Sequence, residues 1–201
     1  MTVPDCMAPV MAALANPSAA SSDFDLNPDV VLPPGRKLRA AGVLVPILCG
    51  PNGGELFLTK RASGLKHHPG QIAFPGGKQD PGDPDIAATA LREAAEEIGL
   101  SSDNVKVPGQ MPAHETVTGF TVTPVVAQVL APFTPIPEKG EVDEVFRVPL
   151  SHVLNPAQYA IQGRRWRGSR RHYFTVPFGP YYIWGATARI LRAMADAAGG
   201  G

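Results

Sequence analysis

The sequence predicts a single α/β or α+β domain in which helices pack on a mixed β-sheet. Its 201 residues, of which 44% are hydrophobic and 18% charged, are enough to bury one sizeable core. Strand-like segments alternate with two segments of helical periodicity, which is typical of a sheet covered by helices. No internal repeat is visible along the chain.

The predicted strands are short apolar runs bounded by turn signals. Asn52 and Gly53 form the clearest of these signals and predict a hairpin between the first two strands. The predicted strands cover residues 40–48, 55–61, 71–74, 120–130, 144–150, 171–178 and 181–184.

A helix is predicted from Asp85 to Ile98, and a second one over residues 186–198. For the first helix, Asp83 is the expected N-cap, Pro84 fits the first turn and Gly99 follows the last residue. Its apolar residues recur at helical spacing and form the expected core face: Ala87, Leu91, Ala94, Ala95 and Ile98.

Residues 1–35 are predicted to form a loosely ordered arm ahead of a folded domain at residues 36–198. The arm is rich in Ala, Pro and Ser. It has no Lys or Arg before Arg36, so it lacks the basic residues of a signal peptide or a mitochondrial presequence. The same composition also suits an arm that wraps a second copy of the chain, which leaves a homodimer open.

Cysteine content, charge and hydropathy predict a cytoplasmic protein. Cys6 and Cys49 allow at most one disulfide and lack metal-site spacing, which suits a reducing cytosol; Cys49 is expected in a buried strand. Eighteen basic residues balance eighteen acidic ones, so the overall charge favours neither a nucleic acid nor an anionic membrane as partner. No apolar run reaches the roughly 18 residues of a membrane helix.

Three glutamates crowd one side of the first predicted helix. At about 100° per residue, Glu93, Glu96 and Glu97 fall within one arc, opposite the apolar residues. Such carboxylates repel by roughly 0.2–0.5 kcal/mol per pair, so either water or a cation should occupy that side. A solvated face is the ordinary explanation. The nearby Pro-Gly-Gly at residues 75–77 and the adjacent Arg92 favour a cation, because clustered carboxylates suit Mg²⁺ or Mn²⁺.

Residues 76–100, GGKQDPGDPDIAATALREAAEEIGL, resemble the Nudix box. That pattern is Gly, five residues, Glu, seven residues, then Arg-Glu-aliphatic-any-Glu-Glu-any-Gly-aliphatic. Its second half matches at every specified position: Arg92, Glu93, Ala94, Glu96, Glu97, Gly99 and Leu100. The first half departs, since fourteen residues separate Gly77 from Arg92 where the pattern has thirteen, and Pro84 falls in the Glu position. The candidate replacements for this glutamate are Asp80, Asp83 and Asp85.

A second motif adjoins the first. Residues 56–77, LFLTKRASGLKHHPGQIAFPGG, resemble the segment that accompanies the box in coenzyme A diphosphatases. The matching positions are Leu58, Thr59, Arg61, Ala62, Gly70, Phe74, Pro75, Gly76 and Gly77. Phe57 replaces a leucine, and Lys66 replaces an arginine, which keeps the positive charge but loses the planar guanidinium. With weaker likeness in later stretches, the resemblance runs from about residue 36 to 193.

The resemblance implies a Nudix-type α/β/α sandwich with a catalytic helix that binds Mg²⁺ or Mn²⁺. It implies Glu93 and Glu97 as metal ligands, and Glu96 as a further ligand or a base acting through water. Arg92 would orient this cluster. The implied substrate-binding residues are Arg61, Lys66, His68, Gly70, Phe74, Gly76 and Gly77. Among these, Arg61, Lys66 and His68, together with His67, form the nearest sequence cluster that could meet the 3′-phosphate of coenzyme A.

Two further regions have alternative interpretations. Glu141 and Glu144 lie where Nudix enzymes can supply another ligand or a general base, although exposed carboxylates are ordinary there; Glu115 is a third candidate. Residues 164–171, RRWRGSRR, have the arginine content of a nucleic-acid site, yet a hairpin turn around Gly168 is the preferred interpretation. A part in phosphate binding is the third alternative.

Three functions therefore compete. The first is a metal-dependent hydrolase of coenzyme A or its thioesters that releases 3′,5′-ADP and a 4′-phosphopantetheine product. The second is a Nudix hydrolase of another nucleoside diphosphate derivative, which the Lys66 replacement keeps open. The third is a binding module without turnover, and the repelling glutamates argue against it. All three have a small-molecule partner.

Overall fold

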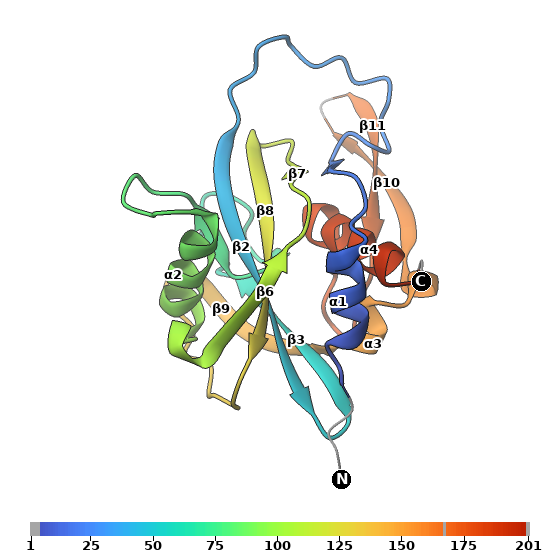
Figure 1. Ribbon diagram of the computed structural model, residues 1–201. Coiled ribbons are helices and arrows are strands. Elements are labelled where there is room, and N and C mark those ends of the chain that lie inside the picture. Colours follow the sequence, from blue (N-terminus) through green and yellow to red (C-terminus); the bar gives the residue numbers. More distant parts are fainter. Residues whose placement is uncertain (1–4, 167, 200–201) are drawn as a thin grey trace.

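A computed structural model describes residues 5–166 and 168–199 (Figure 1). Within these residues, nine strands form one sheet. They are β1 (Ser21–Ser22), β2 (Arg39–Gly50), β3 (Gly53–Arg61), β4 (Ile72–Ala73), β5 (Gly76–Lys78), β6 (Val105–Gln110), β7 (His114–Glu115), β8 (Phe120–Val129) and β9 (Val142–Pro149). The order is β1-β7-β8-β2-β3-β4, and β5, β6 and β9 pair with β2, β8 and β3. Because β2 runs parallel to β8 and antiparallel to β3, the sheet is mixed, as predicted.

Helices cover both faces of this sheet (Figure 1). Helix α2 (Ile86–Ile98) packs on one face over an apolar core that includes Leu44, Phe57 and Val125. Helices α1 (Ala8–Ala15) and α4 (Gly185–Gly199) pack on the other face, where a second core forms. Three short helices complete the set: α3 (Leu150–Val153), η1 (Ser102–Asn104) and η2 (Pro156–Gln158). The predicted α/β/α layering is confirmed.

The arginine-rich stretch forms a hairpin. Strand β10 (Ala160–Trp166) pairs antiparallel with β11 (Ser169–Thr175), and Trp166 lies opposite Ser169. The turn glycine, Gly168, has a positive φ of 82°, a conformation that glycine adopts without strain. Arg167 of the same stretch lies outside the described residues. The strand predicted at residues 181–184 is reduced to isolated bridges.

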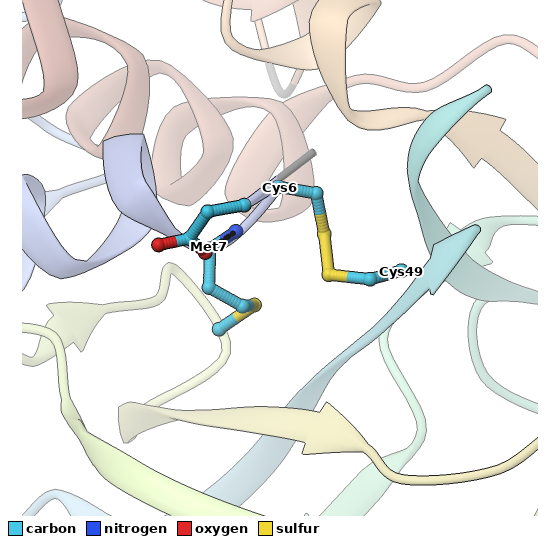
Figure 2. Close-up of a disulfide and its surroundings, with 4 residues drawn as sticks. Cys6, Met7 and Cys49 are labelled. Atoms are coloured by element: carbon cyan, nitrogen blue, oxygen red, sulfur yellow. Dashed lines mark hydrogen bonds between the residues drawn. A yellow bond between two sulfur atoms is a disulfide. The ribbon is translucent and has the colours of Figure 1, made fainter. Parts of the chain in front are cut away.

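Residues 5–22 contain a helix and a short strand, contrary to the expectation of a loosely ordered arm. Val10 and Ala13 of α1 are fully buried, and α1 packs against α4. Ahead of this helix, Cys6 forms a disulfide with Cys49 near the end of β2, with their Cα atoms 5.8 Å apart (Figure 2). This is the one disulfide that the two cysteines allow, although their number was expected to suit a reducing cytosol, and Cys49 is half-buried in its strand. Between β1 and β2, residues 23–38 form turns and irregular chain.

A buried histidine fastens the chain after α1. His114 is completely buried in β7, and its Nδ1 lies 2.9 Å from the Ser21 hydroxyl. Its Nε2 lies 3.1 Å from Asp23 Oδ1. Although a serine, a histidine and an aspartate meet here, Ser21 is only 7% exposed, so the network holds β1 against β7 and offers a substrate no access.

Among the helices of the described ranges, none has both the length and the apolar character to cross a bilayer.

Helix α2 begins and faces differently from the prediction. Its N-cap is Asp85, whose side chain accepts a hydrogen bond of 2.8 Å from the Ala88 amide; Asp83 is not the cap. Gly99 ends the helix in the left-handed conformation, as expected (φ 69°). Ala95 is exposed, whereas Glu97 is buried. The helix is thus rotated so that part of its acidic side faces the protein.

Close backbone packing fixes the distance between α2 and β2. A Cβ added to Gly42 of β2 would lie 2.5 Å from the Ile86 carbonyl oxygen and 3.2 Å from the Ala90 amide nitrogen. These are backbone atoms that cannot swing aside. Replacing Gly42 therefore requires the whole helix to move.

We expect Gly42→Ala to lower the free energy of unfolding by about 1–3 kcal/mol, because overpacking must be relieved by shifting α2. Urea denaturation followed by circular dichroism measures the change. Gly64→Ala is the matched control, since a Cβ at Gly64 meets nothing within 4 Å, and its effect should stay within about 0.5 kcal/mol. Equal stability of the two variants would contradict the packing constraint.

Candidate active site

Glu97 lies buried at the junction between α2 and the sheet. Its side chain accepts a hydrogen bond of 3.0 Å from the backbone amide of Gly76 in β5. The residue is only 4% exposed. A carboxylate in this position loses most of its hydration, and one backbone amide replaces only part of it.

Two adjacent glycines allow the backbone to reach the glutamates. A Cβ at Gly77 would lie 2.6 Å from both carboxylate oxygens of Glu93. A Cβ at Gly76 would lie 2.4 Å from the Gly42 carbonyl oxygen. At Gly76 only glycine fits, because the clash is with backbone, whereas a Cβ at Gly77 would displace the Glu93 carboxylate. Strand β5 thus passes close to the carboxylates. The structure brings together four predicted site residues here, which are Gly76, Gly77, Glu93 and Glu97.

Arg92 is held in place by a residue whose role the sequence leaves open. Its Nε and one terminal nitrogen donate to the two carboxylate oxygens of Asp83, at 2.9 and 3.0 Å. Its other terminal nitrogen donates to Glu93 at 2.8 Å and approaches Glu96 at 3.5 Å. Asp83 also accepts bonds from the Asp80 amide and the Thr89 hydroxyl. Arg92 therefore orients Glu93, and Asp83 orients Arg92.

The electrostatics of the cluster divide these acids into two kinds. Burial raises the pKa of Glu97 to about 7, and the nearby Glu93 and Glu141 carboxylates add to this shift. Burial also raises the pKa of Glu93, although Arg92 opposes the change. The hydrogen bonds from Arg92 instead hold the pKa of Asp83 well below its usual range. The negative charge of Asp83 is thus balanced by Arg92, whereas the charges of Glu93 and Glu97 are not fully balanced within the protein.

Arg61 and Glu141 also reach this cluster. The Arg61 charge lowers the pKa of Glu97, while the Glu141 charge raises the pKa of both Glu93 and Glu97. Arg61 ends β3, and its Nε is buried with no hydrogen-bond partner in the described part of the protein. The loop before Glu141 is fastened to α2, because the Glu138 amide donates to the Glu97 carbonyl oxygen at 3.0 Å.

Glu96 lies at the margin of the buried pair, whereas Glu144 and Glu115 lie apart from it. The Glu96 side chain on α2 is 61% exposed, and its charge raises the pKa of Glu93. Glu144 occupies the other face of the sheet, where it accepts a short hydrogen bond from the Tyr181 hydroxyl. Glu115 forms an ion pair with Arg36. The structure therefore supports Glu141, and not Glu144, as the carboxylate from this region that reaches the cluster.

The remaining predicted substrate residues are spread over the segment between β3 and β5. Lys66 and His68 are exposed on this loop, and His68 has a positive φ of 56°. Gly70 closes the loop, since its amide donates to the Arg61 carbonyl oxygen at 3.0 Å. Phe74 is 5% exposed and packs in the core beneath α4, so its role is packing.

The donor chemistry of Glu93 and Glu97 suits a hard divalent cation. Both carboxylates are shielded from water and carry raised pKa values, which a bound cation would reverse. In the ranges that the structure describes, no three His, Cys, Asp or Glu side chains form a group that could hold a metal ion unaided. The pair therefore fits an ion that completes its shell with water and phosphate oxygens, as Mg²⁺ usually does.

Comparisons with known proteins agree with this geometry. The family model described as the NUDIX domain matches residues 38–167. An uncharacterized Nudix hydrolase, NudL, of Pectobacterium atrosepticum is 38% identical over 180 residues, covering 88% of this chain and 93% of that protein. NudL of Cronobacter sakazakii, also uncharacterized, is 42% identical over 158 residues, covering 78% and 81%. The crystal structure of RenU, a Nudix hydrolase from M. smegmatis, has a TM-score of 0.49 at 25% identity, covering 59% of this chain and 73% of that one.

Desolvated carboxylates beside glycines that let the backbone approach are suited to a divalent cation and the phosphate oxygens of a substrate. The matches to known proteins specify the family, which the geometry alone does not. The chain belongs to the Nudix family and is a hydrolase of diphosphate bonds.

We expect Glu97→Gln to stabilise the metal-free protein at pH 8 but not at pH 4.5. The folded-state pKa of Glu97 is raised from an ordinary value of 4.5 to about 7. The unfolded chain therefore loses this proton first as the pH rises, and the free energy of unfolding falls between pH 4.5 and 7. The loss is complete above pH 7 and amounts to about 3 kcal/mol. Because glutamine does not titrate, the Glu97→Gln variant does not lose this stability.

Urea denaturation in the presence of EDTA at both pH values measures this difference. Glu96→Gln is the control, because the exposed Glu96 should change stability by less than about 0.5 kcal/mol at either pH. A stability difference for Glu97→Gln that does not depend on pH would show that Glu97 is not the desolvated acid.

Proposed function

We propose that this protein hydrolyses the diphosphate bond of coenzyme A or its thioesters, releasing 3′,5′-ADP and a 4′-phosphopantetheine product. One observation supports the proposal: the two sequence motifs meet at Glu97. The amide of Gly76, a position of the upstream motif, donates to the Glu97 carboxylate at 3.0 Å. The charge of Arg61, from the same motif, lowers the pKa of Glu97. The coenzyme A resemblance therefore concerns the same site as the glutamates.

Glu93 and Glu97 are the residues that would hold a divalent cation, with the exposed Glu96 at the margin. When bound, Mg²⁺ or Mn²⁺ supplies charge neutralisation on the diphosphate and lowers the pKa of a coordinated water. Arg92 keeps the Glu93 carboxylate in one orientation, and the Gly76 amide does the same for Glu97. These contacts fix the carboxylates before the substrate arrives, which is what efficient electrostatic catalysis requires.

Arg61 is assigned to the diphosphate. Its buried Nε has no hydrogen-bond partner within the described residues, and a guanidinium left in this state favours an anionic ligand. Glu141 is assigned as the base that accepts the proton of the attacking water. It is exposed, so it can exchange protons with solvent, and its charge is felt by both Glu93 and Glu97.

The alternative is a different nucleoside diphosphate derivative: a dinucleotide, a nucleotide sugar, ADP-ribose or a damaged nucleotide. The observation that favours it is Lys66, which replaces an arginine of the coenzyme A motif and is exposed on its loop. A lysine there binds phosphate as a point charge and selects geometry less strictly than arginine. A non-catalytic binding module is less consistent with the desolvated, mutually repelling glutamates.

A substrate panel tests the proposal. The purified protein is incubated with Mg²⁺ or Mn²⁺ and, separately, with coenzyme A, ADP-ribose, NADH and a dinucleoside polyphosphate, and the products are identified by mass. Coenzyme A should be the preferred substrate, giving 3′,5′-ADP. Preferred cleavage of any compound without pantetheine would overturn the coenzyme A assignment in favour of the alternative.

We expect Glu93→Gln to lower kcat roughly 100-fold or more, because the change removes a charge that acts on the transition state. Glu55→Gln is the matched control. Glu55 lies at the other end of β3, where it pairs with the exposed Arg147, and its loss should leave kcat unchanged. Circular dichroism and thermal melts check folding. If the Glu93 variant kept full activity while remaining folded, the cluster would not be the catalytic centre.

A further inference from the structure

A cleft of about 570 Å³ lies on the sheet face opposite α2. Its walls come from the ends of β3 and β9, from residues 69–72 and from residues 180–184. This volume is within the usual range for small-molecule sites, about 300–1,000 Å³. None of the catalytic glutamates lines it, so the cleft requires a separate explanation.

Aromatic side chains form one wall of the cleft. Tyr182 is 45% exposed and lines the cleft together with Trp184. Tyr181 is held by stacking on Phe146, with ring centroids 3.5 Å apart and planes 9° from parallel. Flat, rigid rings of this kind bind another flat ring well, and a nucleobase gains substantially from such stacking.

Polar and cationic groups complete the lining. Glu144 and Gln71 lie in the cleft, and their carboxylate and amide oxygens can accept hydrogen bonds from the exocyclic amine of a purine. Lys60 contributes a positive charge from β3. Arg164, from β10, lies over the Trp184 ring at 4.4 Å and adds a second charge at the margin. Stacking surfaces next to two cations suit a nucleotide phosphate better than the uncharged amides of pantetheine.

The cleft and the glutamate cluster meet where β3 ends. Lys60 and Arg61 are the last two residues of this strand, and the register between β3 and β9 shifts between them. Lys60 lines the cleft, whereas the Arg61 charge lowers the pKa of Glu97. The Cα atoms of the two residues are about 3.8 Å apart. A ligand that passes the end of β3 beside Gly70 can therefore occupy both sites at once.

We propose that this cleft binds the nucleoside 3′-phosphate half of the substrate. The purine lies against Tyr182 and Trp184, and the 3′-phosphate lies near Lys60 and Arg164. The diphosphate then reaches Arg61 and the glutamates around the end of β3. This inference rests on the proposed function for the identity of the substrate, and it transfers recognition of the 3′-phosphate from Arg61 and Lys66 to the opposite face.

Binding of the separate product halves tests the proposal without turnover. The chain has two tryptophans, so a Trp166→Phe variant reports on Trp184 alone. In this background, 3′,5′-ADP should change the fluorescence saturably, and 4′-phosphopantetheine should not. Tyr182→Ala should weaken 3′,5′-ADP binding about tenfold, since stacking is lost. In turnover, the same change should raise KM for coenzyme A and leave kcat nearly unaltered.

Charge variants test the phosphate assignment. Lys60→Met and Arg164→Met should each reduce the preference for 3′,5′-ADP over 5′-AMP about tenfold, while Lys60→Arg should retain it. The controls are Lys106→Met and Arg147→Met, which change exposed cations on β6 and β9 away from the cleft. They should leave the preference unchanged. Circular dichroism verifies that each variant is folded.

The outcomes separate this proposal from the proposed function. If 4′-phosphopantetheine perturbs Trp184 and 3′,5′-ADP does not, the assignment of the cleft is overturned even when coenzyme A is hydrolysed. It is also overturned if only Lys66→Met abolishes the preference for the 3′-phosphate. If 3′,5′-ADP binds at Trp184 but coenzyme A is not cleaved, the nucleotide cleft stands and the proposed substrate fails.

Discussion

The site depends on two carboxylates that the fold deprives of water. Glu97 and, to a lesser degree, Glu93 lie where α2 meets β5, and both have raised pKa values because burial disfavours their charged forms. This position opposes folding of the metal-free protein. The structure tolerates it because Gly42 and Gly76 let backbone pass where a Cβ would collide with other backbone, and Gly77 leaves room for the Glu93 carboxylate. Three glycines in the sheet thus determine how two glutamates on a helix behave.

Around this pair, one acidic side chain is fully paired within the protein, whereas others remain available to a ligand. Asp83 receives two hydrogen bonds from Arg92, one from a backbone amide and one from Thr89. It serves as an anchor. Glu97 receives one backbone amide and little else. Residues of the same charge, within one short segment, therefore have opposite roles because their hydrogen-bond partners differ.

Much of the fold and the site could be predicted from the sequence, where local pattern and tertiary structure agree. The central strands, the α2 segment and the hairpin around Gly168 all have strong local signals. Burial of Glu97 could not be predicted, because helical periodicity places it on the polar side and only the position of β5 covers it. Asp83 could be identified as a candidate, but its partner depends on the loop after β5. The aromatic cleft depends on strands distant in sequence, and no local pattern indicates it.

The order of the segment that contains α1 and β1 could not be predicted from the sequence for a related reason. Helix α1 has eight residues, rich in alanine, and so short a helix is marginal alone in water. Its order comes from contacts made far along the chain, with α4 and with β2. Short strands such as β1 and β7 have only two residues each and depend on the buried His114 between them. Tertiary contacts, and not propensity, define this region.

The Cys6–Cys49 disulfide gives the chain the covalent topology of a closed ring. The bond joins residues 43 positions apart, and the ring contains α1, β1 and the irregular stretch at residues 28–38. In the chain-entropy model, a ring of this size restricts the unfolded chain by about 4 kcal/mol. A protease that cuts once within residues 28–38 would open the ring without dividing the molecule. The two fragments would migrate as one species on a gel until a thiol reductant separated them.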